Sequence, residues 1–133
     1  MNELSENIAN LLEDNLSKLF GIQGSEATVE QFYKAAATTV NDMLRKRRRE
    51  YNAKVRSVKA KRVYYLSMEF LMGRSLKNNL FNLGLTEAFN DVLSNYGIAL
   101  EDLYDKEPDA GLGNGGLGRL GACYLDALAS QGY

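Results

Sequence analysis

Residues 63–73 read VYYLSMEFLMG, and this stretch decides the class of fold that the sequence predicts. Its first four residues are β-branched, aromatic or aliphatic and almost continuously apolar, which is typical of a strand covered on both faces. A lone strand cannot satisfy its own backbone hydrogen bonds, and the sequence shows no second convincing strand. The chain is therefore expected to be either a mostly helical domain with a minor β element or an amino-terminal piece of something larger, and we favour the piece. The expected fold class is α/β, with this chain mostly helical and containing one or two strands.

Glu69 follows the predicted strand, at the point where its apolar run ends. An unpaired carboxylate is costly to bury among apolar neighbours. Ligands of α/β proteins gather at the carboxyl ends of strands. The position therefore favours Glu69 as a residue that lines a site, against the alternatives of a surface acid or a partner for Arg74.

A glycine-rich loop lies further along the chain, where residues 111–118 read GLGNGGLG. The loop matches G-x-G-x-x-G twice, but a dinucleotide site needs a strand before it, and the only proline, Pro108, stands there instead. A P-loop needs Lys and Ser or Thr after its last glycine, where this loop has Arg119. What remains is a glycine turn that opens a helix and suits a phosphate, or one that only reverses the chain.

Apolar residues at helical spacing predict a helix before Gly21 and a second helix from about residue 29 to the low fifties. Thr28 and Gln31 have the spacing of a capping box at the start of that second helix. Short helices punctuated by glycines are expected over residues 75–104, with Thr86 capping the middle one. After the glycine loop the pattern predicts one more helix, closed by Gly132, with an apolar stripe of Leu117, Leu120, Tyr124, Leu125 and Leu128.

Residues 45–62 hold ten basic side chains and one acid, Glu50. Such a run is typical of a solvated helix face, and the functional alternatives are a phosphorylated effector, an acidic partner or nucleic acid. Tyr51 is the only aromatic residue in the run, which argues against stacking on nucleic acid. The basic residues are Arg45, Lys46, Arg47, Arg48, Arg49, Lys54, Arg56, Lys59, Lys61 and Arg62.

The overall composition is that of a water-soluble domain: 133 residues, 45% hydrophobic, 25% charged, net charge −1. No run approaches a membrane span, and the acidic start does not resemble a targeting segment, so we expect a cytoplasmic protein without membrane contact. The absence of histidine excludes serine–histidine and cysteine–histidine catalysis and most zinc sites within this chain, and no metal site is expected. The single cysteine, Cys123, is expected to be a buried structural thiol.

Two stretches, YYLSMEFLMGRSL (residues 64–76) and EPDAGLGNGGLGRLGACYLDALASQG (residues 107–132), resemble the α-glucan phosphorylases, the family of glycogen, starch and maltodextrin phosphorylases. The likeness covers residues 26–133, which would be part of the amino-terminal domain, cut before the rest of it and the carboxy-terminal domain. Residues 1–25 form a helix and linker that are not distinctive. The resemblance implies a two-domain GT-B glycosyltransferase with its site in the cleft between the domains.

The resemblance also implies pyridoxal-phosphate-dependent phosphorolysis, in which inorganic phosphate releases glucose 1-phosphate from the end of an α-1,4-glucan. By motif position, the amides around Gly115 and Gly116 would face the phosphates of substrate and cofactor. The backbone of Leu117 would meet the glucose, and Glu69 would support the polar network of the cleft. The lysine that holds the cofactor lies outside this chain in the family, so the chain alone is expected to be inactive. Family members are usually homodimers.

The departures from the family pattern concern regulation and one cofactor contact. Many relatives carry an aromatic residue where this chain has Leu71, so that contact is not expected here. The basic helix lacks the aromatic and glutamine pattern of the animal nucleotide-activation site, so activation by AMP is not expected. Two rival interpretations stay open at this point: a helical module that binds an acidic partner or phosphorylated ligand through residues 45–62, and a piece of a nucleotide-binding dehydrogenase.

Overall fold

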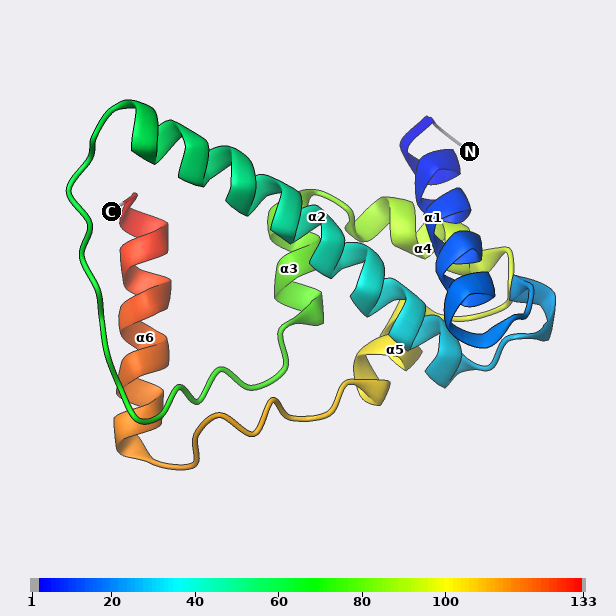
Figure 1. Cartoon of the computed structure of the whole chain (residues 1–133). Coiled ribbons are helices and arrows are strands. Elements are labelled where there is room, and N and C mark those ends of the chain that lie inside the picture. The colour runs from blue at the N-terminus through cyan, green and yellow to red at the C-terminus, as the bar shows by residue number, and fades with distance from the viewer. Residues whose placement is uncertain (1–2, 133) are drawn as a thin grey trace. The chain divides into compact units, whose positions relative to one another are not determined.

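The computed structural model describes residues 3–132, and it is helical throughout its regular structure (Figure 1). The chain divides into two compact units. Unit 1 contains the residues up to Lys59 together with Leu76–Glu107, and unit 2 contains Ala60–Ser75 and the residues from Pro108 onward. The elements in chain order are α1 (Glu3–Phe20), η1 (Gly24–Glu26), α2 (Val29–Ser57), α3 (Leu76–Leu83), α4 (Thr86–Ser94), α5 (Leu100–Lys106) and α6 (Gly116–Gln131).

The expected α/β class is wrong for this chain, because none of residues 3–132 forms a strand. The stretch predicted as a buried strand is extended but solvent-exposed, with Val63 93% and Leu66 89% exposed. A strand requires a neighbouring strand to complete its hydrogen-bond ladder. Further along the same stretch, the Phe70 N–H donates to the Leu112 carbonyl at 2.8 Å, and the Leu71 N–H donates to the Gly118 carbonyl at 2.9 Å.

Unit 1 is a helical core built on α1 and α2. The apolar spacing of α1 brings Ile8, Leu12 and Leu16 to one face, where they are completely or almost completely buried. Helix α1 packs against α2 and α4, and α5 also packs against α2. The predicted helix ends are confirmed at Gly21, which follows α1 with φ +70°, and at Thr28, whose side chain accepts from the Gln31 N–H. Helix α2 runs on to Ser57, slightly beyond the predicted end.

The short helices of unit 1 are confirmed, but one of their predicted N-cap residues is wrong. Gly84 and Gly97 both adopt φ +69°, and each lies between two of the helices α3, α4 and α5. Thr86 does not cap α4 as predicted, because it is already the first helical residue and Leu85 precedes it without a side-chain hydrogen bond. Its hydroxyl is therefore one position too late to reach the first free amides.

A hydrogen-bonded group in unit 1 ties α1 to the turn after α4. The Tyr96 hydroxyl donates to Glu13 Oε1 at 2.5 Å, and the Gly24 N–H donates to Glu13 Oε2 at 3.0 Å. The Tyr96 ring also packs on Phe32, with ring centroids 4.9 Å apart. Burial, and after it the hydrogen bond and charge of Glu13, raise the pKa of Tyr96 to about 12.

This raised pKa predicts a loss of stability in strong alkali. The folded-state pKa of Tyr96 lies above its ordinary value of 10.0, so folding favours the protonated phenol. Its contribution is complete below pH 10.0 and is lost as the pH rises from there through about 12. We expect Tyr96→Phe to lower the free energy of urea unfolding by about 1 kcal/mol at pH 8. The difference from wild type should shrink toward pH 12, and a difference that stays constant across this range would contradict the assignment.

Candidate functional site

Helix α6 in unit 2 opens directly from the glycine-rich loop, as the sequence predicts. Gly115 is the N-cap residue, with extended backbone, and its carbonyl accepts from the Arg119 N–H at 3.0 Å. The amides of Gly116, Leu117 and Gly118 form the first turn, where an α-helix offers its own N–H groups no acceptor. These amides lie at the positive end of the helix dipole, so the helix start has the donors and the polarity for an anion.

The glycines of this region divide into two kinds by what surrounds them. A Cβ atom on Gly113 would lie 2.8 Å from the backbone nitrogen of Leu71, and one on Gly121 would lie 3.1 Å from the Glu69 carbonyl oxygen. By contrast, a Cβ atom on Gly115 or Gly116 would meet nothing within 4 Å. The first kind lets residues 69–71 approach the loop and α6, whereas the second kind leaves open space directly beside the first-turn amides.

The structure brings Glu69 to this helix start. The Asn114 N–H donates to Glu69 Oε2 at 3.3 Å, across 45 residues of sequence. The same oxygen would lie 3.0 Å from a Cβ atom on Gly118, so the carboxylate rests against the first turn of α6. Glu69 is half-buried, and its backbone carbonyl accepts from the Ser67 hydroxyl at 2.9 Å. Glu69, Gly115, Gly116 and Leu117 therefore share one small region, and their functional roles stay predictions.

Aromatic contacts hold the segment of residues 63–73 against α6. The Tyr65 ring lies edge-on to Phe70, with centroids 5.9 Å apart, and edge-on to Tyr124 of α6, with centroids 5.8 Å apart. Edge-to-face pairs of this kind add about 0.5–1.5 kcal/mol each beyond the area that they bury. Together with the Leu71–Gly118 backbone bond, they fix the segment that carries Glu69 to the helix that carries the amides.

Of two expectations about α6, the spacing of the apolar stripe is confirmed and the burial of Cys123 is wrong. The apolar stripe has the predicted spacing, and Tyr124 on it contacts Tyr65, but its five residues are between 37% and 54% exposed. Cys123 is exposed rather than buried, which contradicts the expected structural thiol. The helical period predicts that these side chains lie near one another, but it does not predict what packs on them.

The basic run of residues 45–62 is solvent-exposed at all ten of its Lys and Arg side chains. Seven of the ten lie on α2, and Lys59, Lys61 and Arg62 follow its end. Arg45 lies 4.0 Å from the Asp42 carboxylate in an exposed pair. Within residues 3–132, no group of three His, Cys, Asp or Glu side chains is arranged to hold a metal ion. No helix in the described part of the chain is long and apolar enough to cross a membrane.

The geometry consists of a helix start on a glycine loop with an adjoining carboxylate. The comparisons with known proteins identify the family. Residues 93–133, which include the loop and α6, match the profile of the carbohydrate phosphorylases. Glycogen phosphorylase 2 of Dictyostelium discoideum is 47% identical over 106 residues, or 80% of this chain and 11% of the relative. The brain form of glycogen phosphorylase from Bos taurus is 48% identical over 106 residues, or 80% of this chain and 13% of the relative.

A bacterial relative, the glycogen phosphorylase of Chlamydia trachomatis, is 46% identical over 104 residues, or 78% of this chain and 13% of the relative. The chain belongs to the carbohydrate phosphorylase family, among the α-glucan phosphorylases. It spans between 11% and 13% of the length of the curated relatives it matches.

Proposed function

We propose that this chain is part of a longer α-glucan phosphorylase and supplies the helix start that faces the reacting phosphate. In the proposed reaction, an oxygen of inorganic phosphate forms a bond to C1 of the terminal α-1,4-linked glucose. The bond from C1 to the glucan oxygen breaks, and that oxygen takes up a proton. The products are glucose 1-phosphate and a glucan shorter by one residue. The observation that carries the proposal is the open first turn of α6 within a segment shared with glycogen phosphorylases.

The first-turn amides would act by electrostatics. Phosphorolysis brings a phosphate dianion against a sugar that develops positive charge at C1. Fixed N–H dipoles in a dry cleft can hold that phosphate without reorganising as the reaction proceeds. The amides around Gly115 and Gly116 would contact phosphate oxygens, and the backbone of Leu117 would contact the glucose. The absence of side chains at residues 115 and 116 allows a ligand to come within hydrogen-bonding distance of the backbone N–H groups.

The family's cofactor, pyridoxal phosphate, fits this region at its phosphate end. Open space beside Gly115 and Gly116 and unsatisfied first-turn amides are the features that a phosphate ester needs. When bound, the cofactor would supply a phosphate group that exchanges a proton with the substrate phosphate. The lysine that attaches it is expected outside this chain, and no lysine here is given that role. The complete protein is expected to be a cytoplasmic homodimer.

Glu69 is assigned a positioning role rather than a proton-transfer role. Its carboxylate accepts from the Asn114 N–H and so fixes the loop that leads into the amides. We expect Glu69→Ala to lower kcat of the complete enzyme about threefold or more, since a net hydrogen bond contributes about 0.5–1.5 kcal/mol. Glu69→Gln keeps an oxygen acceptor and should restore most of that loss. Equal losses in both variants would show that the negative charge itself is required, which contradicts a positioning role.

The proposal also predicts a contrast between the chain alone and the complete protein. With glycogen, inorganic phosphate and pyridoxal phosphate, the complete protein should form glucose 1-phosphate. The 133-residue chain should form none at any cofactor loading. Turnover by the chain alone would contradict the placement of the attachment lysine outside it.

The two rival interpretations predict different experimental results. A dehydrogenase predicts saturable binding of NAD by the complete protein, whereas a phosphorylase does not. A helical module that acts through residues 45–62 predicts an acidic partner and no glucan chemistry. The identity to glycogen phosphorylases over about four-fifths of the chain favours the phosphorylase.

A further inference from the structure

A small pocket in unit 1, on the second half of α2, is outside the candidate site. Its volume is about 230 Å³, and it is lined by Met43, Lys46, Arg47, Glu50, Leu83 and Leu85. We call it the α2 pocket. The four residues from α2 recur at steps of three and four, which places them on one face of the helix. Leu83 is the last residue of α3 and Leu85 is the N-cap residue of α4, on either side of the turn at Gly84.

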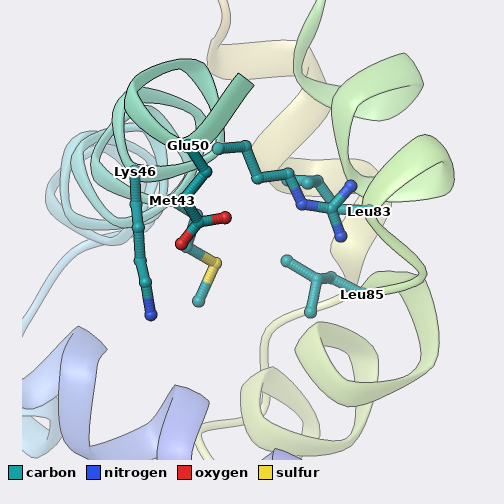
Figure 2. Close-up of a pocket in the computed structure, with 6 residues that line it drawn as sticks. Met43, Lys46, Glu50, Leu83 and Leu85 are labelled. Carbon is teal, nitrogen blue, oxygen red and sulfur yellow. The ribbon is translucent and has the colours of Figure 1, made fainter. Parts of the chain in front are cut away.

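The pocket has an apolar floor and a charged rim. In Figure 2, Lys46 and Glu50 extend from α2 beside Met43, and Leu83 and Leu85 lie across the hollow from them. Leu85 is buried, and Met43 and Leu83 are half-buried, while the three charged side chains are exposed. Among the ion pairs found within residues 3–132, none includes Lys46, Arg47 or Glu50. The charges at the rim are therefore available to a ligand.

The sign of the net charge at the rim indicates which class of ligand the pocket would bind. Lys46 and Arg47 outnumber Glu50, so the rim carries a net positive charge, and the surrounding run of residues 45–62 has ten basic residues to one acid. This field attracts anions and repels cations. The floor offers nothing to a bare inorganic ion, but it can bury one ring or a short chain. A volume of 230 Å³ is below the roughly 300–1,000 Å³ of drug-sized sites, which limits the ligand to a small molecule.

We propose that the α2 pocket binds a small organic anion with an apolar body, of the aromatic carboxylate class. The ring lies on Met43, Leu83 and Leu85, and the carboxylate faces Lys46 and Arg47. Glu50 opposes the carboxylate and accepts a hydrogen bond from any donor that the ligand carries. The proposal does not depend on the phosphorylase reaction, since the pocket and the glycine loop belong to different units.

The test uses benzoate as the probe and follows its binding to the full chain by backbone amide NMR. Benzoate should bind saturably in the millimolar range, with shifts at Met43 and Leu85. Acetate, inorganic phosphate and benzylamine should each bind at least about tenfold more weakly, because each lacks either the ring or the negative charge. Equal binding of benzoate and acetate would overturn the role of the apolar floor. Equal binding of benzoate and benzylamine would overturn the role of the rim, and an absence of saturation by benzoate would overturn the pocket as a site.

A matched pair of variants separates the pocket from the general charge of α2. Arg47 lines the pocket, and its neighbour Arg48 does not, although both side chains are exposed. Arg47→Gln should weaken benzoate about threefold, while Arg48→Gln should change it much less, and Glu50→Gln should strengthen it. All three positions are exposed on a helix, so folding is not at risk. Equal weakening by Arg47→Gln and Arg48→Gln would show diffuse attraction rather than a site.

Discussion

Replacing Gly116 by valine is expected to lower the turnover of the complete enzyme by a factor of about ten or more, with the fold of the chain intact. A Cβ atom at residue 116 meets nothing within 4 Å, so valine fits without a clash inside the chain. Its methyl groups instead fill the space beside the first-turn amides of α6. The loss of one preorganised donor to a reacting oxyanion costs about 3 kcal/mol of barrier. Steady-state kinetics with phosphate as the varied substrate would measure the loss.

Two control variants accompany this measurement. Gly116→Ala adds one methyl group at the same place and should give a smaller loss than valine. Ala127→Val adds bulk on an exposed position of the same helix, away from the loop, and should keep wild-type turnover. Wild-type kinetics in Gly116→Val would contradict the assignment of this amide to the phosphate. A similar loss in Ala127→Val would show that valine acts by weakening the helix.

Gly113→Ala is expected to destabilise unit 2 by about 1–3 kcal/mol, the range for overpacked positions. The added Cβ atom would lie 2.8 Å from the Leu71 backbone nitrogen. That nitrogen cannot move away freely, because its N–H donates to the Gly118 carbonyl at 2.9 Å. The strain therefore falls on the contact that joins residues 69–71 to α6. Hydrogen exchange of the Leu71 amide should speed up as the bond to Gly118 opens more often.

The matched control for this effect is again Gly116→Ala, which places the same methyl group in open space at the first turn of α6. Alanine is the better helix former by about 1 kcal/mol, so this variant should not lose stability. Unchanged protection of Leu71 in Gly113→Ala would show that the two segments are not packed as described. Equal destabilisation by both variants would contradict the division of the glycines into two kinds.

The sequence predicts those features of this chain that short-range interactions determine. The capping box at Thr28, the glycine turns at Gly84 and Gly97 and the start of α6 at Gly116 all depend on a few neighbouring residues. The place of Glu69 after an apolar run predicts a residue that lines a site, and only the resemblance to the phosphorylases places it in the same cleft as the loop. The details that hold it, the Asn114 amide and the close approach at Gly118, carry no signal in the spacing of residues.

The errors arise where a local pattern needs a distant partner. Residues 63–66 have the composition of a strand, yet no described segment pairs with them, so they remain extended and exposed. Cys123 lies in an apolar helical pattern, but burial depends on what packs against that face of α6. The error at Thr86 is of another kind, because a shift of one residue moves a hydroxyl from the cap into the first turn.

The central claim is that this chain contributes the phosphate-facing part of a phosphorolytic site. The most direct test incubates the complete protein with glycogen and isotopically labelled inorganic phosphate and analyses the released sugar. The account predicts glucose 1-phosphate that carries the label, formed only when phosphate is present and strongly reduced in Gly116→Val. Release of free glucose without labelled product, or labelled product in equal amount from wild type and Gly116→Val, would contradict it.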